Sequence, residues 1–398
     1  MKRTPLLLIF LIAFIDLLGF GIVIPILPSY ATKNLGADEF MIGVIVASFS
    51  FMMFIFTPIW GRVSDRIGRK PVLLIGLVSS IIGYLTFALT DSLTMLIASR
   101  MLAGIGGANI SAAQAYIADV TPPDQRAKGM GLIGSAFGLG FVFGPFIGGN
   151  LSVYGYHVPG FFAAGLSAIS LVVTIIFLPS PPIARQSEQA SKQKFFSGKN
   201  WKYLIGHANV SNLIFLQFLL IFAMSNIYAN FALFGIKDYH LSDREVGYLF
   251  ACIGVMNTIM QGGVLRQLTK IFSERTLFVI GNCIMFIGLL SIPFSPGVVA
   301  LFLATALYAI GTGMVIPTSV SLLSQNVSGA DQGTVLGINQ SVSSLARIFG
   351  PMIGGLLFLH IGHQMPFFGS AFITLLATAL SLRLLSKDRL LEPVLHLE

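Results

Sequence analysis

The chain has 398 residues, of which 55% are hydrophobic and only 10% are charged, and its mean hydropathy is +0.84. A water-soluble protein of this size needs more charged surface to cover its apolar residues, so the composition excludes an ordinary soluble domain. The net charge of +8 fits basic loops beside anionic lipid and does not require nucleic acid as a partner.

Apolar runs of about 20 residues recur along the chain, and each is long enough to cross ~30 Å of hydrocarbon as a helix. Strands are not expected, because an open strand in lipid leaves its backbone groups without hydrogen bonds. The chain is predicted to be an all-α membrane protein with 12 transmembrane helices. The runs begin near Leu6, Met41, Pro71, Leu93, Gly129, Gly160, Ser211, Val246, Thr276, Val298, Thr334 and Pro366.

The first run contains one acidic residue, Asp16, ten residues after the run begins at Leu6. Charges at membrane depth are unfavourable and usually functional, so Asp16 is a candidate for proton or substrate coupling. The alternative is that Asp16 only bonds to a neighbouring helix. The run follows two basic residues, as a signal peptide would. No small-residue cleavage site comes after it, so we interpret it as the first span.

A short charged segment, Gly61–Lys70, separates the second and third runs. Its glycines allow close approach, and its five charged residues anchor it at one membrane face. An ordinary basic anchor loop needs neither an aspartate nor glycines at fixed places. The candidate functional residues here are Gly61, Asp65, Arg66, Gly68 and Arg69.

The fourth run contains Arg100, seven residues after Leu93, together with Gln114. Arg100 either takes part in proton handling or pairs with an acid for structural reasons. Both interpretations stay open at this point.

The fifth run has glycines spaced so that another helix can approach closely, and a proline that removes one backbone hydrogen bond. These residues are Gly131, Gly140, Gly144, Pro145, Gly148 and Gly149. The motif Gly-Pro-x-x-Gly-Gly returns 206 residues later as Gly350, Pro351, Gly354 and Gly355. A repeat at about half the chain length indicates a duplicated unit of six helices.

The repeat and one polar interval predict the domain organisation. Residues 180–205 are rich in Pro, Ser, Gln and basic residues, as expected for a linker between a first bundle, 1–179, and a second, 206–398. Nineteen of the 24 Lys and Arg residues fall on the face that holds both termini, and three fall on the other. The positive-inside rule therefore predicts cytoplasmic N- and C-termini.

Polar residues within the runs are candidates for contact with a substrate. Hydrogen bonds between helices are the alternative for the amides, and snorkelling along a helix is the alternative for the arginine. The candidates are Gln114, Asn226, Asn230, Asn257, Gln261, Asn339, Gln340 and Arg347.

The segment Gly61–Lys70 closely resembles the G-x-x-x-D-R-x-G-R-R/K signature of the major facilitator superfamily. The resemblance covers the whole chain and implies two pseudo-symmetric six-helix bundles, the major facilitator fold. It also implies that Asp65 faces the start of the eleventh span, near Gly333–Val335, and that Arg69 pairs with Asp119. Together these residues would latch the bundles in an outward-open state. The corresponding segment of the second half lacks the aspartate.

Three further motifs resemble those of antiporters in this family. The segment that begins at Asp16 resembles the first-span motif of tetracycline and multidrug antiporters. The segment that begins at Arg100 resembles the fourth-span motif, whose arginine is linked to proton handling. The glycine and proline residues of the fifth run resemble the antiporter motif, so the resemblance implies antiport over symport or uniport.

The leading hypothesis is a proton-coupled antiporter, a monomer of the bacterial inner membrane, that exports small lipophilic compounds or drugs by alternating access. Its expected partners are a small-molecule substrate, protons and membrane lipids. The alternative is a carrier of the same fold for one metabolite, lipid or siderophore, and a more distant one is a non-transporting receptor. No enzyme is predicted, because the chain has no nucleotide phosphate-binding motif and no convincing metal-ligand set. The proton gradient is expected to replace a cofactor.

Overall fold

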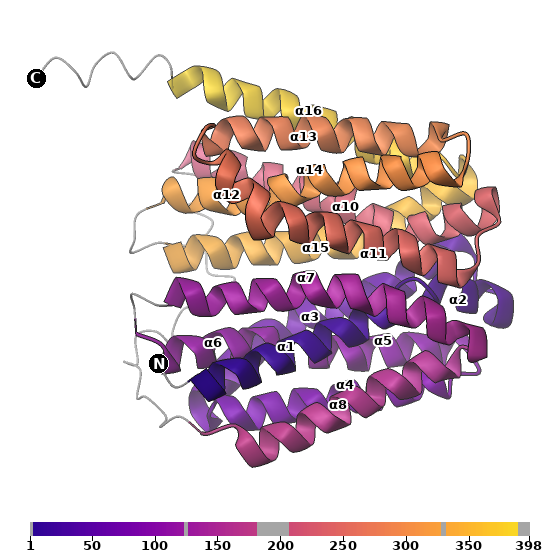
Figure 1. Ribbon diagram of the computed structural model, residues 1–398, viewed down its shortest axis with the longest axis vertical. Coiled ribbons are helices and arrows are strands. Elements are labelled where there is room, and N and C mark those ends of the chain that lie inside the picture. Colours follow the sequence, from indigo (N-terminus) through magenta and orange to yellow (C-terminus); the bar gives the residue numbers. More distant parts are fainter. Residues whose placement is uncertain (1–2, 123–125, 181–206, 328–331, 389–398) are drawn as a thin grey trace, which may run out of the picture.

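The computed structural model describes residues 3–122, 126–180, 207–327 and 332–388 (Figure 1). Its regular elements are helices. Those of the first half are α1 (Arg3–Val23), α2 (Leu27–Leu35), α3 (Glu39–Ile67), α4 (Arg69–Ala88), α5 (Leu93–Gly107), α6 (Ile110–Val120), α7 (Arg126–Leu151), η2 (Ser152–Tyr154) and α8 (His157–Phe177). Those of the second half are α10 (Ala208–Tyr239), α11 (Asp243–Ile259), η4 (Met260–Val264), α12 (Leu265–Leu268), α13 (Glu274–Ser291), η5 (Ile292–Phe294), α14 (Val298–Gln325), α15 (Gln332–His360) and α16 (Met365–Asp388).

Twelve helical segments of the described residues are long and apolar enough to cross a membrane, and they coincide with the twelve predicted runs. The predicted fold class is confirmed. Ten of the spans are each built on one long helix, whereas the fourth consists of α5 and α6 and the eighth consists of α11, η4 and α12.

The break in the fourth span inserts a polar side chain between two helices. Asn109 lies between α5 and α6, and its Nδ2 donates a hydrogen bond to the carbonyl oxygen of Leu73 in α4, at 3.1 Å. Gly76 of α4 provides the space, since a Cβ atom there would collide with the Asn109 side chain. The break in the eighth span is the π-helical turn η4, which contains Gly262 and Gly263. Such turns interrupt the regular ladder of α-helical hydrogen bonds.

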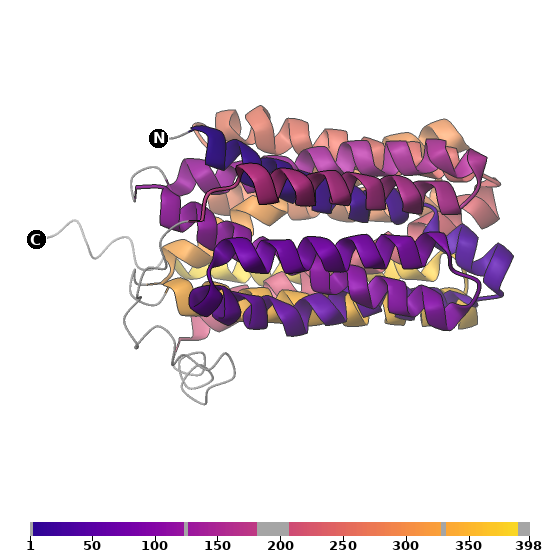
Figure 2. The same ribbon diagram turned by 90° about the horizontal axis from the view of Figure 1, so that it is seen from below.

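The helices form two groups that lie side by side, with the first half in indigo to magenta and the second in pink to yellow (Figure 1). Both chain termini emerge at the same end of the long helices in both views (Figures 1 and 2). We call this the terminal end and the opposite one the far end. All but the first residue of the predicted linker, 180–205, falls within 181–206, outside the described part, so the domain boundaries stay a prediction.

The two halves meet through two helix pairs, α3 with α15 and α7 with α11. Both contacts lie towards the far end, where a Cβ atom on Gly149 of α7 would come within 2.8 Å of the carbonyl oxygen of Asp243 in α11. Towards the terminal end, α7 and η4 separate. Cβ atoms added to Gly131, Gly134 and Gly262 would have no neighbour within 4 Å.

The repeated glycines perform the same packing role in both halves. Gly144 and Gly148 of α7 lie against the backbone of α1 in their own half, and Gly350 and Gly354 lie against α10 in theirs. The last glycine of each copy faces across the interface, Gly149 towards α11 and Gly355 towards α3. Because glycine has no side chain, it lets helix backbones approach this closely.

Candidate functional site

Asp16 lies within α1 and is 7% exposed, so burial at membrane depth agrees with its place in the sequence. Its carboxylate is within hydrogen-bond reach of Ser80 in α4. Its Oδ1 atom is buried and has no hydrogen-bond partner among the described residues. A buried acidic oxygen without a donor is unfavourable unless the group can take up a proton.

Arg100 is 3% exposed and packs against two rings of α4. Its Cζ atom is 5.0 Å from the centre of the Phe87 ring and 5.9 Å from that of Tyr84. Its Nη2 atom is buried without a hydrogen-bond partner among the described residues. Such cation–π contacts compensate in part for the missing counter-charge.

Tyr84 connects these two charged residues and was missed by the sequence analysis. It is buried in α4, and its hydroxyl group lies close to Gly19 of α1, one turn from Asp16. It interacts electrostatically with both Asp16 and Arg100. Ser80 and Tyr84 are four residues apart and therefore lie on one face of α4. This face of α4 therefore presents Ser80 and Tyr84 towards Asp16.

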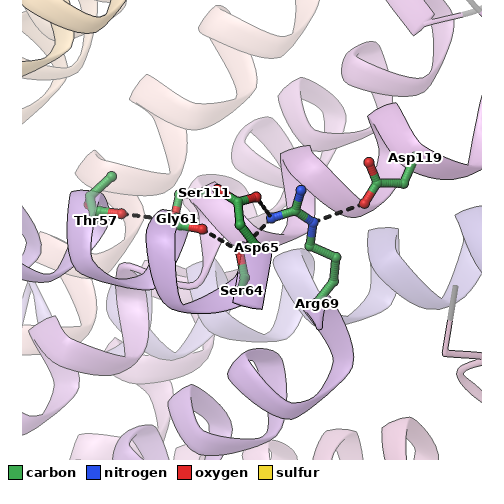
Figure 3. A network of polar contacts seen from close by, with 7 residues as sticks. All are labelled: Thr57, Gly61, Ser64, Asp65, Arg69, Ser111 and Asp119. Carbon is green, nitrogen blue, oxygen red and sulfur yellow. Dashed lines mark hydrogen bonds and ion pairs between the residues drawn. The ribbon is translucent and has the colours of Figure 1, made fainter. Parts of the chain in front are cut away.

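The charged segment between α3 and α4 forms a network around one guanidinium group (Figure 3). Arg69 donates from Nη1 to Asp65 Oδ1 at 2.5 Å and to Ser64 Oγ at 2.7 Å, and from Nε to Asp119 Oδ2 at 2.9 Å. The side chain of Arg69 is 9% exposed, whereas that of Asp65 is 44% exposed. The pair between Arg69 and Asp119 is thus present, and the latching role remains a prediction.

Gly68 explains why this segment needs a glycine at a fixed place. It ends α3 with a φ of 96°, a conformation that side chains rarely adopt, and it directs the chain back into α4. Gly61 has open space around it, and Arg66 is exposed on the surface of the terminal end. At the corresponding place in the second half, Gln325 donates to Glu274 at 2.9 Å.

A set of polar contacts closes the far end between the two halves, and the sequence analysis did not find it. Glu39 of α3 forms an ion pair with Lys237 of α10. The Tyr156 hydroxyl donates to Asp243 Oδ2 at 2.9 Å, and the Tyr248 hydroxyl donates to Asn150 Oδ1 at 3.3 Å. Burial and the nearby Asp243 raise the pKa of Tyr156 above the ordinary value of a tyrosine, so it remains a hydrogen-bond donor at neutral pH.

His363 also has a partner that its sequence position did not reveal. Its Nδ1 atom lies 2.9 Å from Asp238 Oδ1 at the far end, and its ring stacks on Phe358. Among the described residues there is no group of three or more His, Cys, Asp and Glu side chains that could hold a metal ion.

Two of the predicted substrate contacts lie buried between helices of the second half, and their role in substrate contact stays a prediction. Asn226 and Asn230 of α10 are 1% and 0% exposed. The Nδ2 atom of Asn226 donates to Pro366 O at 3.0 Å and to Ser370 Oγ at 2.8 Å, and its Oδ1 accepts from Asn230 at 2.9 Å. Asn226 thus joins α10 to α16, whereas the Oδ1 atom of Asn230 is buried without a hydrogen-bond partner among the described residues.

The remaining amide candidates have different surroundings. Asn257 accepts a hydrogen bond from Thr312 at 3.1 Å, and Asn339 is 6% exposed with an unpartnered Oδ1. Gln114, Gln261 and Gln340 are exposed although they lie within spans. Arg100 and Gln114 do not share a face, because the fourth span breaks between them and one is buried while the other is exposed.

Arg347 lies in α15, one turn before Pro351, and is partly buried. Its Nη2 atom donates to Ser344 Oγ at 3.1 Å in the same helix. It also interacts electrostatically with Tyr228 of α10.

The profile of the Major Facilitator Superfamily matches residues 9–268 and again residues 213–395. The chain is 31% identical over 342 residues to the tetracycline resistance protein, class C, of Escherichia coli. The alignment covers 85% of this chain and 86% of that protein. It is 28% identical over 351 residues to the quinolone resistance protein NorA of Staphylococcus aureus, covering 87% and 88% of the two chains.

Similarity also extends to solved structures. The human organic anion transporter MFSD10 superimposes with a TM-score of 0.70 at 25% identity, over 95% of this chain and 99% of that one. The family of this chain follows from its twelve spans, its charged segment around Arg69 and these similarities. The chain belongs to the major facilitator superfamily and is a multi-pass integral membrane protein.

Proposed function

We propose that the protein is a proton-coupled antiporter of the bacterial inner membrane that exports small lipophilic compounds or drugs. It is a secondary active transporter and not an enzyme, and the proton gradient serves in place of a cofactor. The observation that carries this proposal is Asp16, an acid buried in α1 with one oxygen unpartnered. The resistance proteins of E. coli and S. aureus support drugs as the substrate class.

Proton coupling follows from the surroundings of Asp16. Ser80 is the described side chain that stabilises a carboxylate at this depth by hydrogen bonding. Protonation removes the charge and so changes which packing of α1 against its neighbours is favoured. Because α7 lies against α1 through Gly140, Gly144 and Gly148 and against the second half through Gly149, a change at α1 can reach the interface. Coupled transport requires two arrangements of the helices whose relative stability depends on the bound proton.

The contacts between the halves correspond to one of the two states. The far end is closed by Glu39, Lys237, Tyr156 and Asp243, and α7 separates from η4 at the terminal end. With cytoplasmic termini, as the basic residues predict, this is the inward-open state. Exposed amides such as Gln114, Gln261 and Gln340 would be unfavourable in hydrocarbon, which supports a water-filled space between the halves.

The network around Arg69 acts in the opposite state. Asp65 is largely exposed here, and closure of the terminal end would bring it towards the start of α15, where a helix N-terminus favours an anion. Arg69 and Asp119 already hold the segment in place in the present state, so only Asp65 would gain a new contact on closure. The second half has Glu274 and Gln325 at this place, so the latch is one-sided.

The test uses the purified protein in proteoliposomes with an imposed pH gradient, and the probes are tetracycline and a fluorinated quinolone. Transport should follow the proton gradient as exchange, and Asp16→Asn should abolish the gradient-driven component. Asp91→Asn, which neutralises an exposed acid outside the spans, is the matched control and should leave transport unchanged.

Each other outcome is decisive. Uptake in the same direction as protons would replace antiport by symport. Movement of a single metabolite, lipid or siderophore in place of the drugs would favour a dedicated carrier. If none of these compounds moved in wild-type or Asp16→Asn proteoliposomes under any imposed gradient, the transport proposal would fail and a receptor would be favoured.

A further inference from the structure

Arg347 is a cation at membrane depth without an acidic partner. It lies fifteen residues after the start of α15 and thirteen before its end, so it is roughly 20 Å from either end of the helix. That is farther than an arginine side chain can snorkel to reach the interface. All eight acidic residues of 206–398 lie at the ends of the spans or beyond them. In the described part of the second half, no acidic side chain therefore lies at this depth.

The contacts of the guanidinium group do not compensate for its charge. Its Nη2 atom donates to the hydroxyl of Ser344 in its own helix, at 3.1 Å. The nearby titratable group with which it interacts is the neutral hydroxyl of Tyr228. No described acid lies within ion-pair distance of Arg347. A partly buried cation with free donors is best stabilised by an anion that binds to it.

Aromatic rings from both halves surround the position of Tyr228. The Tyr228 ring is 6.0 Å from that of Phe141 in α7 and 6.5 Å from that of Phe250 in α11. The row continues from Phe141 to Phe20 of α1 at 5.9 Å, and from Phe20 to Phe49 of α3 at 4.5 Å. Phe20, Phe141 and Tyr228 are each partly exposed. They therefore offer ring surface to a ligand.

This cation and these rings lie near the terminal-end limit of the closed interface, about one turn from the contact between Gly138 and Thr258. Pro351, one turn beyond Arg347, contacts Gly43 across the interface, and the carbonyl oxygen of Phe141 contacts Gly254. Towards the terminal end α7 and η4 are apart, since a Cβ atom on Gly134 or on Gly262 would have no neighbour within 4 Å. A ligand that enters from the open end would meet Arg347 and the ring row together.

We propose that Arg347 binds the anionic group of an amphiphilic substrate whose aromatic part stacks on Phe20, Phe141 and Tyr228. The guanidinium fork suits a carboxylate or a paired enolate and phenolate, and the Tyr228 hydroxyl is placed to add a further hydrogen bond. This assignment deepens the proposed transport function by naming its substrate class, and it rests on that function for the direction of movement.

The test measures binding alone, in lipid nanodiscs without a pH gradient, and corrects for empty nanodiscs. Three probes share one ring system and differ in charge: 9-anthracenecarboxylate, 9-anthracenemethanol and 9-anthracenylmethylammonium. The wild-type protein should bind the carboxylate most tightly. Arg347→Gln should weaken carboxylate binding by about 10- to 100-fold, the range of a hydrogen bond to a charged group. The neutral alcohol should be almost unaffected, and Arg347→Lys should retain part of the carboxylate affinity.

Matched variants separate this role from a structural one. Arg266→Gln removes an exposed arginine of α12 and should leave the affinities for all three probes unchanged. Tyr228→Phe keeps the ring and removes the hydroxyl, and should weaken only the carboxylate. It also provides the test if Arg347→Gln does not fold. Equal weakening of all three probes, or unchanged carboxylate binding in both variants, would overturn the proposal.

The two proposals can fail separately. The nanodisc assay contains no proton gradient, so it reports charge selectivity whether or not transport is coupled to protons. If Asp16→Asn lost gradient-driven transport but the wild-type protein bound the three probes equally, only the role of Arg347 would be refuted. If the wild-type protein preferred the carboxylate probe but moved no compound against a proton gradient, only the antiport mechanism would be refuted.

Discussion

Gly247 of α11 lies against the carbonyl oxygen of Pro145 in α7, so closely that a Cβ atom on Gly247 would sit 2.5 Å from that oxygen. The other interface repeats this contact, with Gly43 of α3 against the carbonyl oxygen of Pro351 in α15. Both contacts join the two halves, and both use the proline of the repeated motif. The close approach of the halves at the far end therefore depends on two glycines outside the motif.

We expect Gly247→Ala to disfavour the state closed at the far end, because the added methyl group meets a backbone oxygen that cannot move aside cheaply. A steric misfit of this kind destabilises packing by about 1–3 kcal/mol. The measurement is the labelling rate of Gly131→Cys by a membrane-impermeant maleimide, after Cys252 and Cys283 are replaced by serine. Labelling should slow in Gly247→Ala. Gly134→Ala is the control, since its Cβ would have open space, and a similar slowing there would contradict the explanation.

Asp65 and Asp119 should behave differently although both pair with Arg69. Asp119→Asn should lower thermal stability by about 1–2 kcal/mol, because the largely buried Arg69 loses one of its two carboxylates. Asp65→Asn should affect stability less, because its side chain is 44% exposed. It should instead increase labelling of Gly131→Cys, since the state closed at the terminal end loses its anion. Equal effects of the two variants in both assays would refute a latching role for Asp65.

The ion pair between Glu39 and Lys237 should stabilise far-end closure. Glu39→Lys and Lys237→Glu alone each place like charges together, and each should slow labelling of Gly131→Cys. The double exchange should recover most of the wild-type rate. The pair is partly exposed, so a double-mutant cycle should give a coupling of roughly 1 kcal/mol or less. Additive effects without recovery would show that the pair contributes nothing to closure.

Asn226→Ala tests whether this buried amide supports the packing of the second half or contacts a substrate. It removes an amide that bonds to Pro366, Ser370 and Asn230, so thermal stability should fall by about 1–2 kcal/mol. The relative affinities for different substrates should not change. Gln340→Ala, at an exposed site in α15, should leave stability unchanged. A change in substrate preference with normal stability in Asn226→Ala would instead support a substrate contact.

Several site features were accessible from the sequence because they depend on local chemistry. An acid within an apolar run, such as Asp16, stands out whatever its neighbours are. The fixed spacing around Arg69 includes Gly68, whose φ of 96° only glycine adopts readily. The amides were ambiguous, because a buried Asn226 and an exposed Gln340 have the same residue chemistry and similar helical spacing. Glu39 and Lys237 are 198 residues apart, and nothing in either segment identifies the other as its partner.

The sequence by itself determined the number of spans and the duplicated organisation, because hydrocarbon thickness and backbone hydrogen bonding act on each segment separately. The tertiary structure decided which glycines face across the interface, which end of the protein is closed and what surrounds Arg347. These properties depend on distances between helices that are far apart in the chain. The closed end in particular reflects a balance between two packings of the same sequence, and local patterns do not encode which of the two is occupied.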